Sequence, residues 1–453
     1  MKVLQLSLLL LLFAPSLGAD EGSPGYRLLR FDEDWSLAQP GPDLLSQIKN
    51  MTISDESSIR LSLGGQLRSR VESWDGFGFG GTGQRSDTFW LNRLRYHGDL
   101  SFGPHARAFV EVMHSLSSDR DLPGGRRATE HDESALHNAF FDFPVEGLTF
   151  RVGRQELLFG SQRLVSPRDW SNVRRTWDGI RVLSQWAGWD VSGFWGALVI
   201  NREKSFNQSS ENTQLFGLYG TQKNGKRERD AYLLGLHQSD AAFGGTRGLE
   251  DRFTVGGRTK SPLAETAVML ELEGAYQFGE VGDKSINAFM LSSELSFELR
   301  HADWKPKLLL GVDYASGDRR AGGSVQTFNS LFPSGRRFFG HTNTLGRSNL
   351  IALSPGIVLR PRPDLTVVSR AHAFWRSSKQ DAIYGVTGGV VRGGALGRSR
   401  EVGLELDVAV TYVLSDQLKA LIGYSRLFAG RFIRESGPSD DIQFTYVQAE
   451  YTF

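Results

Sequence analysis

The chain has 453 residues and no cysteine, which excludes a disulfide framework, a thiolate metal site and a cysteine nucleophile. Its 52 Lys and Arg balance 51 Asp and Glu, so no global charge excess points to nucleic acid or to an anionic membrane surface as a partner. The 52 Gly, 29 Phe, 10 Trp and 11 Tyr favour strands and tight turns over helical bundles.

The N-terminus has the pattern of a secretory signal peptide. Lys2 precedes an apolar run from Val3 to Phe13, which Pro15 and small residues follow. The pattern predicts a signal peptide over residues 1–18, cleaved after Gly18. A membrane anchor would need about 20 apolar residues, and this run is shorter. Later residues contain no comparable stretch, so the exported chain is periplasmic, secreted or a barrel.

Residues 19–57 are predicted to form an N-terminal segment that is either periplasmic or plugs a pore, and residues 58–453 show strand-like alternation. From Val402 to Tyr412, apolar side chains alternate with residues such as Glu405 and Asp407. The same period of two recurs over 59–72, 270–278 and 289–299. A soluble β-sandwich would show this alternation as well, so the connections must decide between the two folds.

Short and long connections alternate along the chain. Short turns are expected at 103–105, 144–147, 187–188 and 360–363, and long polar stretches at 74–87, 117–133, 158–174, 201–212 and 315–348. Transmembrane barrels have short periplasmic turns and long outer loops. The sequence therefore predicts an all-β, transmembrane antiparallel β-barrel of about 18 strands. Its longest loop, 315–348, is long enough to fold over or into the lumen.

The chain ends in the aromatic Phe453, and Tyr451, Ala449 and Val447 share its strand face. Such an ending resembles the terminal strand that the barrel-insertion machinery of the outer membrane recognises. Together with the signal peptide and the loop asymmetry, it favours a Gram-negative outer-membrane barrel over a soluble sandwich. Lipid and lipopolysaccharide of the outer membrane are then expected to surround the chain.

No catalytic constellation is visible. The nine His form no recognisable motif with carboxylates and serines, and Gly-x-Ser-x-Gly, His-Glu-x-x-His and P-loop patterns are absent. Asp119, Asp121 and Asp132 suggest at most a weak calcium site, and solvated loop charge is the favoured interpretation. We therefore expect neither an enzyme nor a cofactor.

The polar strand faces carry more information, because residues that alternate with lipid-facing ones must line the interior of a barrel. Predicted inward-facing basic residues on the early strands are Arg60, Arg68, Arg70, Arg93, Arg95, Arg151, Arg175 and Arg181. Later strands offer Glu271, Glu273, Glu294, Glu405 and Asp407, with Arg370 and Arg376 between them. An arginine arc opposite acidic strands would set up a transverse field and favour anions. The alternative, structural ion pairs between neighbouring strands, accounts for about half of them.

Several segments resemble the alginate export family of outer-membrane proteins. They are Tyr26–Trp35, Phe150–Glu156, Asn172–Arg181, Asp313–Asp318, Thr327–Pro333, Ser348–Leu350, Phe374–Arg376 and Gly403–Val408. The resemblance implies an eighteen-stranded barrel with an Arg-lined lumen, which passes an acidic polysaccharide outward in the alginate exporter. Arg151, Arg154, Arg175, Arg181 and Arg376 fall in these segments as pore candidates. Arg154 is in phase with Val152, so it reaches the pore only at the rim.

The leading hypothesis is a porin for anionic, sugar-like solutes, with alginate export as one named version. The expected partner is an anionic oligosaccharide or polysaccharide, or a small anionic solute. The alternatives are a general porin, a hydrocarbon-type channel with an apolar lumen, an outer-membrane enzyme with a catalytic cluster at the rim, and an adhesin or receptor that binds through its loops.

Overall fold

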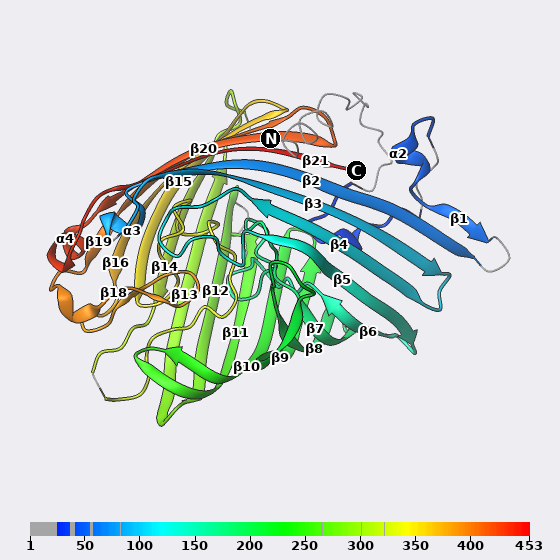
Figure 1. Ribbon diagram of the computed structural model, residues 1–453. Helices are drawn as coiled ribbons and strands as arrows, with labels where there is room; N and C mark the ends of the chain where they lie inside the picture. The colour runs from blue at the N-terminus through cyan, green and yellow to red at the C-terminus, as the bar shows by residue number, and fades with distance from the viewer. Residues whose placement is uncertain are drawn as a thin grey trace.

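The computed structural model (Figure 1) describes residues 25–36, 41–54, 58–81, 83–263, 266–299, 301–320 and 322–453. The predicted signal peptide, residues 1–18, lies outside the described residues. No helix in the described part of the chain is long and apolar enough to cross a membrane. The helices are short: η1 (Arg30–Asp32), α2 (Leu44–Gln47), α3 (Phe77–Gly80), η2 (Gly394–Leu396) and α4 (Arg431–Ser436).

The described residues form a closed antiparallel β-barrel. One sheet contains 19 strands, and leaving out β1 (Met51–Ser54), which pairs with β2, leaves 18 in the ring. The ring closes because β2 pairs with β3 on one side and with the last strand, β21, on the other. The predicted fold class is therefore confirmed.

The barrel strands range from 8 residues in β6 to 17 residues in β2, β9, β10 and β11. Their bounds are β2 Ile59–Asp75, β3 Asp87–Phe102, β4 Arg107–Ser117, β5 Asp132–Val145, β6 Leu148–Gln155, β7 Trp177–Trp186, β8 Trp189–Ile200, β9 Gln208–Asn224, β10 Arg227–Phe243, β11 Thr246–Pro262, β12 Val268–Val281, β13 Lys284–Glu298, β14 Lys307–Ala315, β15 Leu350–Arg362, β16 Leu365–Arg376, β19 Glu401–Val413, β20 Leu418–Ala429 and β21 Ile442–Thr452. A separate hairpin, β17 (Ile383–Tyr384) and β18 (Val390–Arg392), lies between β16 and β19.

The two faces of each strand differ as the period of two requires. On β19, Leu406 and Val408 are 44% and 45% exposed, whereas Glu405 and Asp407 between them are 1% and 5% exposed. The apolar side chains thus face outward, where lipid would cover them, and the carboxylates face the interior.

Substitutions on β19 test this assignment. Leu406→Arg should impair membrane insertion, since a lipid-facing Arg costs about 2 to 4 kcal/mol near the bilayer midplane. Ala409→Arg, three positions along on the inward parity, should insert normally. The heat-modifiable fraction on gels measures insertion, and equal loss in both variants would contradict the assignment.

Connections are short at one end of the barrel and mostly long at the other. In Figure 1, α3 and α4 lie at the end with the long loops, and β1 and α2 lie near the C-terminus at the opposite end. The long outer loops used below are L2 (118–131), L3 (156–176), L4 (201–207), L7 (316–349) and L8 (377–400). Two outer connections, 244–245 and 282–283, are instead tight turns. Gly244, Gly245 and Gly282 adopt positive φ there, which such turns require.

L3 and L7 fold into the barrel and contact each other. An isolated parallel bridge joins Val165 of L3 to Phe332 of L7, and another joins Val325 of L7 to Ile286 of β13. Phe159 of L3 and Phe328 of L7 belong to one buried apolar cluster with inward side chains of the wall. Of the two positions expected for the loop over 315–348, over the lumen or into it, these contacts correspond to the second.

The N-terminal segment, here residues 25–36, packs on the inward side of β4 and β5. Phe31 meets the inward rings of Phe109 and Phe140 edge-on, at centroid distances of 5.7 and 5.2 Å. The Arg107 guanidinium donates to the Phe31 carbonyl at 2.7 Å. Arg30 donates to the carbonyl of Phe453, the last residue of the chain, at 3.0 Å. The N-terminal segment and the last strand therefore meet at the seam between β2 and β21.

Candidate functional site: the charged lumen and its loops

Arginines of β2 and β3 hold L3 in place. Arg68 and Arg93 are neighbours across these strands and are both fully buried. Arg68 donates to the backbone carbonyls of Asp169 and Ser171 at 2.7 and 2.9 Å. Arg93 donates to the Asp169 carboxylate at 2.9 Å. These arginines therefore point inward as predicted, but L3 covers them.

A buried charge network continues to the base of L3. Arg95 pairs with Glu111, Arg174 pairs with Glu156, and His137 Nε2 lies 3.0 Å from the Glu156 carboxylate. Ligand atoms of Glu111, His137 and Glu156 lie within 4.8 Å of one another, a spacing that could suit a metal ion. The guanidinium groups of Arg95 and Arg174 already neutralise both carboxylates, so we interpret the cluster as structural.

The aspartates of the weak calcium hypothesis do not form a group. The Asp119 side chain is 95% exposed and pairs with Arg126. Asp132 is buried and accepts a hydrogen bond from Asn207 at 2.7 Å. The Asp121 backbone N–H donates to Asp87. Solvated loop charge and local hydrogen bonds account for these residues.

Inward groups of the late strands anchor L7 and L8. Glu405 accepts hydrogen bonds from the backbone N–H and the hydroxyl of Thr342 at 2.8 and 2.6 Å. Asp407 lies 3.2 Å from His372 Nε2. Arg376 donates to five backbone carbonyls of L8 and stacks on Phe432 at 3.7 Å. Arg376, Glu405 and Asp407 thus bind loop backbone or neighbouring side chains.

The other predicted arginines occupy different environments. Arg151 forms a bidentate pair with Asp142 at 2.7 and 2.8 Å, and Arg370 pairs with Glu294 at 2.6 Å. The rest are placed as follows: Arg60 is exposed and donates to Thr52, Arg70 pairs with Glu72, Arg175 donates to the Phe332 carbonyl, and Arg181 donates to Ser192.

Arg154 does not face the lumen. It shares the parity of Val152, which is 45% exposed on the outward face, and forms a bidentate pair with Asp178 at 2.7 and 2.8 Å. The carbonyl of Asn207 in L4 also accepts from Arg154. The pair therefore sits on the outward face beside an outer loop, and we do not retain Arg154 as a pore residue.

Three arginines that join the loops to the barrel wall or to each other lie on loops, where strand alternation gives no signal. Arg163 of L3 reaches Glu271 and Glu273 on β12, with 3.0 Å to the latter. Arg347 of L7 pairs with Asp313 at 2.9 Å. Arg336 of L7 lies over Phe444 and Trp170 at 4.1 and 4.8 Å. The nearest sequence signals were the motif segments, among them Ser348–Leu350 beside Arg347 and Asp313–Asp318, which contains its partner Asp313.

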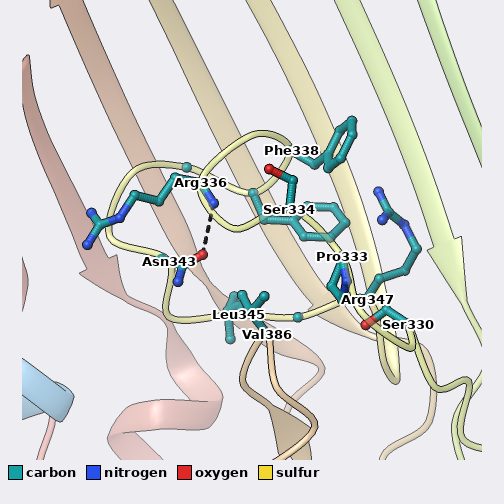
Figure 2. A pocket seen from close by; sticks show the side chains of 12 residues that line it. Ser330, Pro333, Ser334, Arg336, Phe338, Asn343, Leu345, Arg347 and Val386 are labelled. Carbon is teal, nitrogen blue, oxygen red and sulfur yellow. Dashed lines mark hydrogen bonds between the residues drawn. The ribbon is translucent and has the colours of Figure 1, made fainter. Parts of the chain in front are cut away.

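L7 makes a compact turn between Ser330 and Arg347. Figure 2 shows Arg336 and Arg347 pointing away from each other on its two sides, and Leu345 beside Val386 of L8. The Arg336 backbone N–H donates to the Asn343 side chain at 2.9 Å. The cavity inside the turn holds about 10 Å³, enough for no more than one water. L7 is thus filled by its own side chains.

Two larger cavities lie between L2, L3, L7 and L8, and we call them together the outer vestibule. Their volumes are about 310 and 250 Å³, and they share Thr129, Arg168, Val386 and Thr387. The arginines that line them are Arg70, Arg127, Arg168, Arg174, Arg175 and Arg336, and the carboxylates are Glu72 and Glu130. Among the described residues, no carboxylate pairs with Arg168 or Arg175. The outer vestibule is therefore electropositive.

A closed barrel with an apolar outer face, a charged interior and loops folded into its lumen defines an outer-membrane channel. The sequence profile of the alginate export family matches residues 59–446, which is most of the chain. The chain belongs to the alginate export family, as its motif segments indicated, and it is located in the outer membrane.

Solved porin structures share the fold. Pseudomonas aeruginosa OpdO has a TM-score of 0.59 at 13% identity and covers 87% of this chain and 97% of its own. OpdK of the same species, solved with vanillate, has a TM-score of 0.57 at 14% identity, and the match covers 86% of this chain and 98% of OpdK. OccK2 (OpdF) of that species, in complex with glucuronate, has a TM-score of 0.57 at 11% identity, and the match covers 86% of this chain and 98% of OccK2. None of the curated proteins matches the chain. At these identities the likeness extends to the fold alone.

Proposed function

We propose that the chain is a channel for small anionic solutes, sugar acids among them, which enter through the outer vestibule. The observation that carries the proposal is the charge of this vestibule, where Arg168 and Arg175 have no carboxylate partner in the described part of the chain. Guanidinium groups bind carboxylates in a planar, bidentate geometry. Of the predicted pore arginines, Arg70 and Arg175 line the vestibule and Arg151 and Arg181 line an inner cavity, so we assign these four to the solute path.

The size of the path favours small solutes over a polymer. L3 and L7 occupy the lumen, and the vestibule cavities of about 310 and 250 Å³ are near the lower end of small-ligand pockets. Vanillate and glucuronate, which the OpdK and OccK2 structures contain, are both small carboxylates. Family membership keeps alginate export as a second candidate. An oligomannuronate that blocks the current at far lower concentration than glucuronate would favour that candidate.

Reversal potentials test the polarity of the channel. In a KCl gradient at low salt the channel should prefer anions, and the preference should fade at 1 M, where the Debye length falls to about 3 Å. Arg168→Gln should shift the reversal potential toward cations because it removes a positive charge that no carboxylate of the described residues pairs with. Arg202→Gln, at an exposed arginine of L4 outside both cavities, should leave the potential unchanged. Cation preference in the unmodified channel would contradict the proposal.

A further inference from the structure

A separate cavity lies at the inner side of the barrel, between the N-terminal segment, the base of L3 and strands β6 and β7. Its volume is about 320 Å³. It shares no residue with the outer vestibule. Any solute bound here therefore contacts a second set of residues on its way through the channel.

One side of this inner cavity is basic. Arg151 is fixed by its bidentate pair with Asp142 and by stacking on Phe140 and Phe31, at 4.0 and 4.7 Å. Arg181 donates its Nε to Ser192 at 2.7 Å, and no described residue accepts from its two Nη amines. The guanidinium of Arg27 has no partner among the described residues either. Free donors of two arginines are thus available at this cavity.

The charges around the inner cavity leave a single positive excess. Arg27, Arg151 and Arg181 contribute three positive charges, while Asp32 in the lining and Asp142 behind Arg151 contribute two negative charges. No ion pair joins Asp32 to these arginines in the described part of the chain. The cavity is therefore matched in charge to one carboxylate.

The rest of the lining is apolar, unlike the usual wall of a polar channel. Four leucines complete it, among them Leu158 at the base of L3 and Leu183 on the inward parity of β7. A sugar acid would leave its hydroxyl groups without hydrogen-bond partners against this wall, which costs free energy. A hydrocarbon body would instead remove apolar surface from water.

We propose that the inner cavity is a binding site for a monocarboxylate with a compact apolar body, with Arg181 as the carboxylate donor and Leu158 and Leu183 as the apolar wall. This inference deepens the proposed function, on which it rests, because it gives the solute path two binding sites with different chemistry. The outer vestibule selects charge. The inner cavity selects an apolar body joined to that charge.

The test measures block of single-channel current in planar bilayers by probes added from the side of the short turns. Cyclohexanecarboxylate should block at a concentration about tenfold lower than glucuronate, which has the same charge on a polar body. Cyclohexylmethylammonium should not block. Equal block by cyclohexanecarboxylate and glucuronate would overturn the proposal.

Variants locate the site. Arg181→Gln should raise the half-blocking concentration of cyclohexanecarboxylate about tenfold, as expected for loss of one charge-assisted hydrogen bond. Leu183→Asn should weaken block by cyclohexanecarboxylate about fivefold and leave block by glucuronate unchanged. Heat-modifiability on gels confirms that each variant forms a barrel. Unaltered block in Arg181→Gln would overturn the assignment.

Arg168→Gln separates this inference from the proposed function. It should shift the reversal potential without changing the half-blocking concentration of cyclohexanecarboxylate, because Arg168 lies in the other cavity. An anion-selective channel that glucuronate blocks as well as cyclohexanecarboxylate would refute the inner site alone. A cation-selective channel that cyclohexanecarboxylate still blocks would refute the proposed function alone.

Discussion

Removing residues 322–345 from L7 is expected to raise the single-channel conductance several-fold while the barrel still forms. L7 fills lumen space with Phe328, Phe332 and Phe339, and it bridges to L3 through Phe332. The wall does not need L7, because β14 pairs with β15 along the whole length of β14. The deletion removes Thr342, which donates to Glu405, and the His341 backbone N–H, which donates to Asp407, but it also admits water that can solvate both carboxylates.

Single-channel conductance in bilayers measures the opening of the path, and heat-modifiability on gels shows whether the barrel still forms. The matched control removes residues 202–205 from L4, a connection that starts and ends at strand ends and contributes one residue, Asn201, to the vestibule. That deletion should leave the conductance close to the unmodified value. An unchanged conductance after the L7 deletion would mean that L7 does not restrict the path.

Asp169→Asn is expected to release L3 and to make the open-channel current noisy. Burial alone would raise the pKa of Asp169, but the guanidinium groups of Arg174, Arg93 and Arg68 outweigh it and hold the pKa well below its usual range. The ionised form thus stabilises the folded loop above about pH 4, near the pKa of a free aspartate, and this stabilisation is lost as the pH falls through the lowered value. Replacement by Asn removes the negative charge of residue 169 at every pH, so Arg68, Arg93 and Arg174 lose their shared carboxylate partner.

Single-channel recordings across pH check this expectation. At pH 7 the Asp169→Asn channel should show noise that the unmodified channel shows only in strong acid. Asp119→Asn removes the same charge at an exposed site on L2 and should behave as the unmodified channel. If Asp169→Asn is quiet at pH 7, the backbone contacts of Arg68 and Arg93 hold L3 without the carboxylate.

The sequence predicted the wall of the barrel well because alternation is a local property. The period of two around Leu406 and Asp407 sets which side faces lipid, and pairing with neighbouring strands cannot change it. The same logic placed Arg154 in doubt, and the structure puts it on the outward face. What alternation could not reveal is whether an inward side chain meets water or a loop.

Arg68 and Arg376 illustrate that limit. Both were predicted to line the pore, and both face inward, yet one binds the backbone of L3 and the other the backbone of L8. The partners are over 100 positions away for Arg68 and between 3 and 23 positions away for Arg376, and they lie in segments without periodicity. Because loop conformation depends on such tertiary contacts, the inner cavity and the outer vestibule could not be predicted from the sequence.

The contact between Arg30 and the carbonyl of Phe453 spans 423 positions of the chain and has a consequence for the order of assembly. That carbonyl also accepts from the Gly65 backbone N–H, and the Phe453 N–H donates back to Gly65, so its final position exists only when β21 has met β2. Arg30 can therefore dock only after the ring has closed. Phe31 can pack on β4 and β5 before closure, but the Arg30 end of the N-terminal segment is fixed only afterwards, so a protease site introduced next to Arg30 should be cut during biogenesis and protected once the ring has closed.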